Sequence, residues 1–169
     1  KIKVISIEPD ALNFACLNLN IYDNNFNELI TAYPFSIDDN KSLSNLYKKE
    51  FRFGNSTNSF DRIIDEDGNK FKPTYVQGSP SISIDNLSIN LGLNPNYIKI
   101  DVDGNELKII NSMKNLFNNN QSISILIEIN ENFSEHREII NIFKKNNFEF
   151  VSKRLCNQDN LTHNYIFRR

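Results

Sequence analysis

The 169-residue sequence contains only five glycines, and no two of them form a G-x-G pattern. Glycine-rich loops let a backbone approach a phosphate or nucleotide closely, and this sequence carries no loop of that kind. It has no tryptophan, only two histidines, and two cysteines without the spacing of zinc ligands. The G-x-S-x-G, Walker A and H-E-x-x-H patterns are missing as well, which excludes the common hydrolases, nucleoside triphosphatases and zinc proteases.

Long apolar runs and an excess of one charge are also missing. No stretch reaches the roughly 18 apolar residues of a membrane span, so no membrane partner is expected. The net charge is −2, and no basic stripe stands out locally, so nucleic acid is not an expected partner. With 39% hydrophobic and 24% charged residues, the composition is that of a globular domain. We expect a cytoplasmic protein in which Cys16 and Cys156 are buried, reduced thiols.

Short β-branched runs alternate along the chain with helical patterns of about 11 residues. The expected strands are 3–7, 29–33, 81–84, 97–102, 124–129, 148–152 and 165–168, and the expected helices are 11–21, 86–91, 106–117 and 134–145. Asp10 and Asp85 are the expected N-caps of the first two helices, and Gly92 ends the second. The alternation predicts an α/β fold with a mostly parallel sheet, closed by an antiparallel pair of strands at one edge.

Residues 40–80 are different in kind, because they are polar and carry three of the five glycines. Asp67 and Gly68 stand between two β-prone runs, as a hairpin turn would. We expect loops and short antiparallel strands here, inserted into a single domain that spans residues 1–169. The sequence shows no linker or internal repeat that would divide the chain.

In an open parallel sheet, ligands bind beyond the carboxyl ends of the strands. Polar residues follow several predicted strands at that edge: Glu8, Ser36, Asp38, Asp101, Asp103, Glu128 and Asn130. An acidic residue at such a strand end often accepts hydrogen bonds from ribose hydroxyls. Each residue alone is more often a helix cap or a solvated loop carboxylate. Their joint placement on consecutive strand ends indicates a ligand site.

Three segments of this rim, SISIDNL, IKIDVDGNELKII and ILIEIN, closely resemble the signature segments of FkbM-family methyltransferases in order and spacing. The segment VISIEPD and the helical pattern NFACLNLNIYDN after it are similar to the family's second strand and following helix. The resemblance covers about residues 1–40 and 80–169, whereas residues 40–80 match no part of the family that we can identify.

The resemblance implies a class I Rossmann-like fold that binds S-adenosylmethionine and methylates a hydroxyl of a sugar or secondary metabolite. The partner would be a small-molecule or glycan acceptor, and the oligomeric state is left open. Glu8 matches the acidic residue that takes the ribose hydroxyls, and the loop near Asp38 matches the adenine edge. The implied cofactor-binding residues are Glu8, Pro9, Ser36, Ile37, Asp38 and Asp101. Asp101 or Glu128 would be the base that accepts the hydroxyl proton.

One departure from the family is large, because its first strand and glycine-rich loop have no counterpart here. We therefore expect the chain to be the C-terminal part of a longer domain, with the absent strand between strands 3–7 and 97–102. Residues 1–169 alone are expected to bind the cofactor weakly and to be inactive. The alternative is a non-catalytic α/β binding module that kept the acidic rim of a methyltransferase.

The remaining acidic residues and the two histidines are expected to have structural roles. Asp101, Asp103 and Glu106 offer oxygen ligands for a hard cation, but Ser112 stands where a calcium loop needs its glutamate, so no metal is expected. Asp103 and Glu106 are better explained as caps of the following helix. His136 lies among charged neighbours on a helix and His163 precedes the last strand, and both are expected to be structural.

Overall fold

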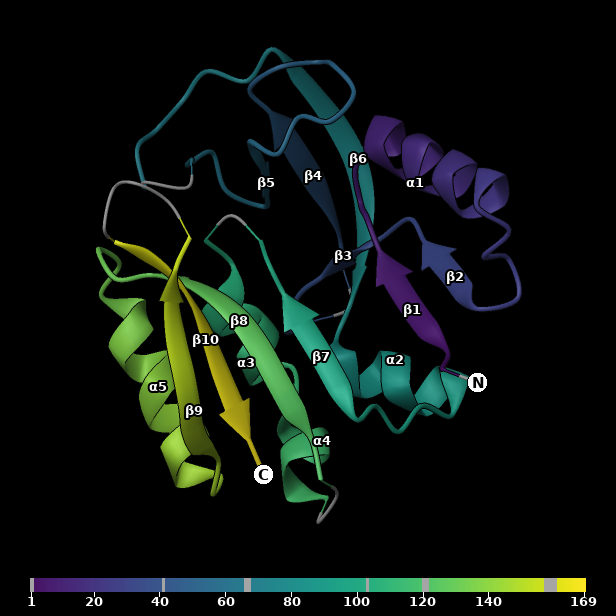
Figure 1. Cartoon of the computed structure of the whole chain (residues 1–169). Helices are drawn as coiled ribbons and strands as arrows, with labels where there is room; N and C mark the ends of the chain where they lie inside the picture. Colours follow the sequence, from purple (N-terminus) through teal and green to yellow (C-terminus); the bar gives the residue numbers. More distant parts are fainter. Residues whose placement is uncertain (1, 41, 66–67, 103, 120–121, 157–160) are drawn as a thin grey trace.

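The computed structural model describes residues 2–40, 42–65, 68–102, 104–119, 122–156 and 161–169 (Figure 1). Its elements are β1 (Val4–Ile7), α1 (Ala11–Asp23), β2 (Ile30–Tyr33), β3 (Ser36–Ile37), β4 (Leu43–Lys48), β5 (Asn58–Phe60), β6 (Tyr75–Ile82), α2 (Ile84–Leu91), β7 (Tyr97–Ile100), α3 (Glu106–Asn111), α4 (Lys114–Asn118), β8 (Ser124–Asn130), α5 (Glu135–Lys145), β9 (Glu149–Leu155) and β10 (Thr162–Arg168). The fold is α/β, as the alternation in the sequence predicted.

In the described residues the strands form three hydrogen-bonded groups, β1–β2, β7–β8–β10–β9 and β3–β6–β4–β5. Parallel ladders join β1 to β2, β3 to β6 and β7 to β8, and the other ladders are antiparallel. The sheets are therefore mixed, and the described residues do not confirm a mostly parallel sheet. The reason is that β10 turns back between β8 and β9, and that β4 pairs antiparallel with both β5 and β6. The expected antiparallel edge pair, β9 and β10, is present.

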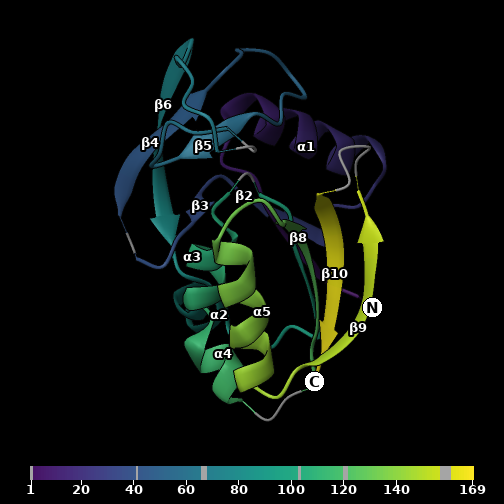
Figure 2. The ribbon, with the colours of Figure 1, turned by 90° about the vertical axis from the view of Figure 1, so that its left-hand side faces the viewer.

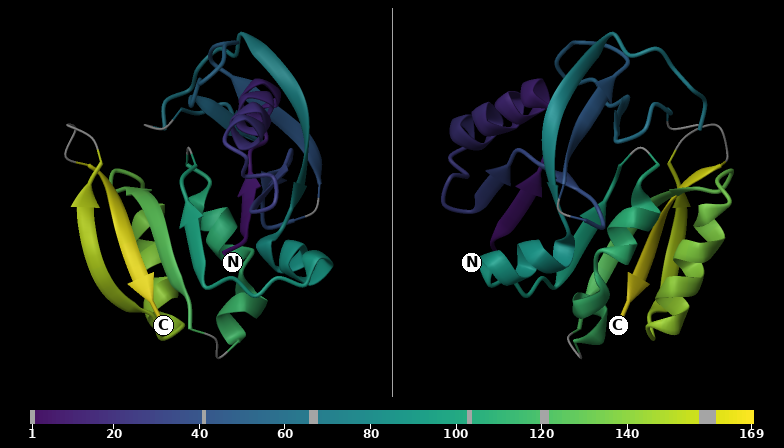
Figure 3. Two further views of the ribbon diagram at one scale, coloured as in Figure 1. Left: turned by 45° about the vertical axis from the view of Figure 1, so that its right-hand side comes forward. Right: turned by 180° about the vertical axis from the view of Figure 1, so that it is seen from behind.

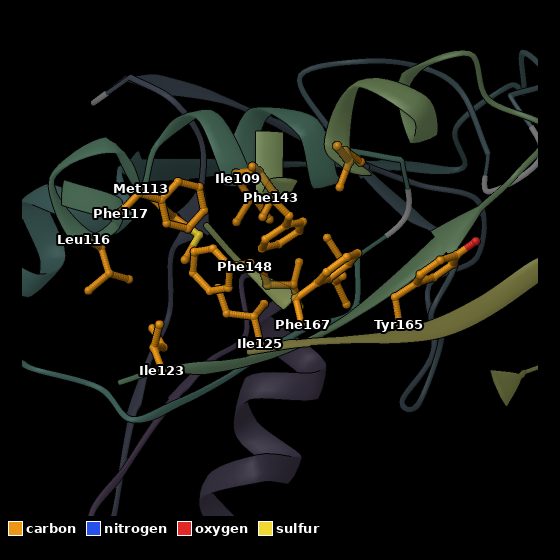
Figure 4. Packing of buried hydrophobic residues seen from close by; sticks show 14 of the residues in the cluster. Ile109, Met113, Leu116, Phe117, Ile123, Ile125, Phe143, Phe148, Tyr165 and Phe167 are labelled. Carbon is orange, nitrogen blue, oxygen red and sulfur yellow. The ribbon is translucent and has the colours of Figure 1, made fainter. Parts of the chain in front are cut away.

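The main hydrophobic core lies between the β7–β8–β10–β9 sheet and helices α3, α4 and α5, which pack on one of its faces (Figure 2). Strand β8 alternates between half-buried and buried residues, so that Ile125, Ile127 and Ile129 all face the helices. Aromatic rings fill the space between the layers (Figure 4), and those of Phe143 and Phe167 stack with centroids 4.1 Å apart.

The helix expected at residues 106–117 is broken into α3 and α4 at Ser112. The break follows from tertiary hydrogen bonds, because the N–H of Ile84 donates to Ser112 Oγ at 3.1 Å and the N–H of Asp85 donates to the Ser112 carbonyl at 3.0 Å. Ser112 thus bonds to the first turn of α2, and the chain turns before α4 begins.

The expected cap at Asp85 is also wrong. Ser83 caps α2, its Oγ accepting from the N–H of Asn86 at 3.1 Å. The Asp85 carboxylate instead accepts from the N–H groups of Asn115 and Leu116, at 2.9 and 3.1 Å, and so caps α4 from a neighbouring helix. Gly92 ends α2 in the left-handed conformation, as predicted.

Helix α1 begins at its predicted cap, since Asp10 Oδ1 accepts from the N–H groups of Leu12 and Asn13. Its expected apolar face is largely uncovered, however, because Ile21 is the helix's one buried residue and Leu19 is 61% exposed. Cys16 on this helix is exposed and Cys156 is partly buried, so the expectation of buried thiols is wrong for Cys16.

Residues 40–80 form short antiparallel strands, as expected, with β4 pairing with both β5 and β6 (Figure 3). Gly68 has φ +81° and its N–H donates to the Asp65 carbonyl, which agrees with a tight turn, although Asp67 lies outside the described residues. In the described part of the chain, no helix is long and apolar enough to cross a membrane.

Candidate functional site

The carboxyl ends of β1, β7 and β8 point to one side of the molecule, toward the β4–β5–β6 sheet (Figure 1). This is the edge at which an α/β fold binds ligands. Glu8 follows β1 and Asp101 follows β7, whereas Glu128 and Asn130 lie within β8 near its carboxyl end. In the described residues no ladder joins β1 to β7 or β8.

Glu8 follows β1 directly and is half-buried. Its Oε1 accepts from the N–H of Asp10 at 2.8 Å, which fixes the orientation of the carboxylate. Burial raises the pKa of Glu8 above its usual value, and the nearby Asp10 charge adds to this, while the Asp10 N–H and the Lys48 ammonium lower it. The carbonyl of Pro9 accepts from Gln77 Nε2 at 2.7 Å, so a strand of the middle segment also holds this loop.

The predicted adenine-edge residues lie on and just after β3. Ser36 is buried and its Oγ shares a hydrogen bond with Ser79 Oγ at 3.1 Å, while Ile37 packs against the hydrophobic core. Asp38 is also buried, and one of its oxygens lies 3.5 Å from Lys108 Nζ. The polar side chains of this segment are therefore engaged within the protein.

The two predicted catalytic carboxylates lie close together. Asp101, after β7, forms an ion pair of 2.8 Å with Lys99, and its side chain is 48% exposed. Glu128 on β8 stands beside the Cys156 thiol, and burial together with the Glu128 carboxylate raises the pKa of that thiol to about 11. The hydrogen bond to Asp101 raises the pKa of Lys99, and the charge of Glu128 adds to this rise. Asp101 also adds to the rise of the Cys156 pKa, so these four groups interact electrostatically.

The acidic loop between these carboxylates and α3 is only partly described, because Asp103 lies outside the described residues. Glu106 is the first residue of α3, and its Oε1 accepts from the N–H of Gly104, before the helix, at 3.2 Å. In the described residues no side chain caps α3 by a hydrogen bond, so the expected capping role of Glu106 is not confirmed. In the described part of the chain, no group of three or more histidine, cysteine, aspartate or glutamate residues is placed to hold a metal ion.

A pocket of about 170 Å³ lies on the helix side of the same edge, and sequence reasoning missed it. Arg62 reaches it from the middle segment, where its Nη2 donates to the Gly104 carbonyl and to Asn105 Oδ1. His136 lines it from α5 and contacts the Phe133 carbonyl through Nδ1 at 2.5 Å. A carbonyl only accepts, so Nδ1 carries the proton and Nε2 of a neutral ring is left as an acceptor. The pocket is lined by residues from three segments, 62–68, 104–108 and 129–139, that lie far apart in the sequence. No local sequence pattern therefore predicts it.

A second polar cluster at the start of β10 was also missed. Glu131 accepts a hydrogen bond of 2.7 Å from the Tyr165 hydroxyl, forms an ion pair with Lys153, and lies 2.9 Å from His163 Nδ1. The hydrogen bond from Lys153 holds the pKa of Glu131 below its usual value, and burial raises the pKa of Tyr165. His163 thus faces a carboxylate at the end of β8.

The FkbM methyltransferase domain model matches residues 1–150 and so includes residues 40–80, which show no resemblance to the family's signature segments. The crystal structure of a methyltransferase FkbM from Methylobacillus flagellatus KT matches 98% of this chain with a TM-score of 0.61. The two sequences are 17% identical, so this similarity shows the fold alone, and the match spans 36% of that protein's chain. No curated protein sequence matches this chain.

Proposed function

The chain belongs to the FkbM methyltransferase domain family, and from that membership we propose that it serves S-adenosylmethionine-dependent methylation of a hydroxyl group. The acceptor would be a small molecule or a glycan. We further propose a class I Rossmann-like arrangement, in which an additional strand position lies between β1 and β7. The strand order supports this, because β2–β1 and β7–β8–β10–β9 follow one another across the molecule without a ladder joining β1 to β7 in the described residues.

Glu8 is the observation that carries the proposal. It stands at the carboxyl end of β1, half-buried, with one carboxylate oxygen already oriented by the Asp10 N–H. Its second oxygen accepts no hydrogen bond from the described residues, which suits a group that receives ribose hydroxyls. The residues present therefore fit the ribose of the cofactor, although the 169-residue sequence contains no G-x-G loop.

When bound, the cofactor supplies an electrophilic methyl group on a sulfonium centre. The residues of the chain have to orient the acceptor hydroxyl and accept its proton. Asp101 and Glu128 are the proposed bases, since Asp101 follows β7 and Glu128 lies in the adjacent strand β8, near its carboxyl end. Release of S-adenosylhomocysteine by Asp101→Asn and Glu128→Gln, made in a longer protein that also carries the family's first strand and glycine-rich loop, distinguishes them, because loss of the base should lower turnover by about 10²–10⁴. Parental turnover in both variants would remove both carboxylates from the mechanism.

The test of the proposal is S-adenosylhomocysteine binding by calorimetry, with the same longer protein as the parent. Glu8→Ala should cost about 1–3 kcal/mol of affinity, the scale for losing a charged hydrogen-bond partner, and Glu8→Gln should cost less because one acceptor survives. Glu50→Gln is the matched control, since Glu50 is exposed and its carboxylate is engaged by Arg52. Binding that is equal in the parent, Glu8→Ala and Glu50→Gln would show that Glu8 does not hold the ribose. Affinity without turnover on any hydroxylated acceptor would favour a binding module.

A further inference from the structure

We infer that Lys48, in the middle segment, is a positioning residue for the ribose-binding carboxylate of Glu8. The inference rests on the proposed function, and it assigns a role to the β4–β5–β6 sheet. That sheet lies against the carboxyl end of β1 and the start of α1 (Figures 1 and 3). Lys48 is the last residue of β4, and its side chain is fully buried.

The buried ion pair between Lys48 and Asp10 is the centre of the contact. Both side chains are at most 1% exposed, and Lys48 Nζ touches Asp10 Oδ2. The same carboxylate accepts from Asn58 Nδ2 at 3.1 Å, and its other oxygen caps α1. The backbone N–H of Asp10 donates to Glu8 Oε1 at 2.8 Å. Asp10 is thus held by β4 and β5 and in turn holds Glu8.

Gln77 of β6 fixes the same loop from a second strand. Its Nε2 donates to the Pro9 carbonyl at 2.7 Å, and its Oε1 accepts from the N–H of Ala11 at 3.0 Å. Three strands of the middle segment therefore contact the three residues that follow Glu8. The loop carries Glu8 on one side and the start of α1 on the other, so both are placed by the same contacts.

Stability alone gives a poor reason for this ion pair. Removing two charges from water is costly, and the cost is recovered only if every proton finds a partner. Lys48 Nζ is buried and, despite its contact with Asp10, makes no hydrogen bond of regular geometry in the described residues. Lys48 also acts on Glu8 electrostatically, because its ammonium lowers the pKa that burial and the Asp10 charge raise. The Lys48 ammonium therefore partly offsets these two causes and favours the ionised form that accepts ribose hydroxyls.

Lys48→Met is the test variant, since it keeps the unbranched side chain, shorter by one atom, and removes the charge. Lys49→Met is the matched control, because Lys49 is the next residue and pairs with Asp65 at the surface. Lys48→Met leaves the buried Asp10 carboxylate without its cation, and this alone could prevent folding. In that case Lys48→Met is combined with Asp10→Asn, which removes both charges and keeps a side-chain oxygen to cap α1.

The first measurement is hydrogen exchange of the Asp10 amide, which donates to Glu8. Exchange about tenfold or more faster in the Lys48 variant than in Lys49→Met supports the inference, and equal rates overturn it. The second is a double-mutant cycle with Glu8→Gln, read as S-adenosylhomocysteine affinity. We expect Lys48→Met to weaken binding about tenfold in the parent and hardly at all beside Glu8→Gln. An equal loss in both backgrounds would overturn the positioning role. If the parent does not bind S-adenosylhomocysteine, the proposed function fails, and the exchange measurement still decides whether Lys48 holds the Glu8 loop.

Discussion

At the residue scale, Glu8 shows a conflict between the proposed function and stability. A carboxylate that must accept ribose hydroxyls has to be ionised, yet its site is half-buried and raises its pKa. The folded protein therefore binds the Glu8 proton more tightly than the unfolded chain does. Binding sites commonly carry such locally unfavourable groups, because selection retains them for the ligand.

This conflict predicts a pH-dependent gain of stability in Glu8→Gln. A carboxyl whose folded pKa is raised contributes nothing unfavourable below the usual pKa of 4.5, and destabilises the folded state as pH rises above it. Glu8→Gln should therefore melt at a higher temperature than the parent at pH 7, and the difference should shrink toward pH 4. Thermal melts across this range measure it. A difference that grows as the pH falls would contradict the assigned direction of the shift.

The two cysteines offer a second prediction at this scale. At pH 8 a thiol with a pKa of about 11 is ionised to about one part in a thousand, so Cys156 should react slowly with iodoacetamide. Cys16 is exposed and should be alkylated first. Glu128→Gln removes a negative charge beside Cys156 and should speed its labelling, but modestly, because burial is the larger cause. Peptide mass spectrometry follows both sites. An unchanged rate at Cys156 would place Glu128 away from the thiol.

At the scale of single elements, local signals were predictable and tertiary ones were not. The cap of α1 at Asp10 and the end of α2 at Gly92 depend on neighbours within a few residues, and both were predicted correctly. The break between α3 and α4 depends on Ser112 bonding to the first turn of α2, which lies 28 residues earlier along the chain. No helical periodicity in residues 106–117 could reveal it.

Asp85 lies in α2 and caps α4, so its replacement should lower the free energy of unfolding. Asp85→Ala removes both side-chain acceptors at the start of α4 and should destabilise the protein by about 1 kcal/mol, the usual cost of a lost cap. Asp85→Asn keeps one acceptor and should cost less. Urea unfolding measures both, with Asp39→Ala as a control for loss of an acidic residue from an exposed loop. If Asp85→Ala were as stable as this control, the cap across helices would not contribute.

At the scale of the whole molecule, the predicted strand ends indicated the edge of the candidate site. They did not indicate the residues that the middle segment contributes around it. Glu8, Asp101 and Glu128 were predicted for this edge because parallel strands bring their carboxyl ends together, and their roles stay predictions. Lys48 and Arg62 were not, because both come from the middle segment, whose fold against the rim is set by tertiary contacts. The place of β10 between β8 and β9 was not predicted for the same reason, since strand order depends on pairing partners that periodicity does not identify.

Burial is also distributed unevenly over the molecule. Strands β1 and β2 contain no buried residue, whereas β8 alternates with three fully or nearly buried isoleucines in the main core. The Glu8 loop therefore belongs to the less buried part of the fold. Local opening costs least where few apolar contacts are lost, so the two parts should differ in hydrogen-exchange protection.

We expect amides of β1 and β2 to exchange more than about tenfold faster than those of Ile125–Ile129, which mass spectrometry of peptides can measure. S-adenosylhomocysteine should then slow exchange at β1 and the Glu8 loop, because a ligand that binds the closed form stabilises it by mass action. It should change β8 little, since opening there already requires unfolding of the main core. Equal protection of β1 and β8 without ligand would contradict the uneven stability. Slowing confined to β8 would place the cofactor away from Glu8.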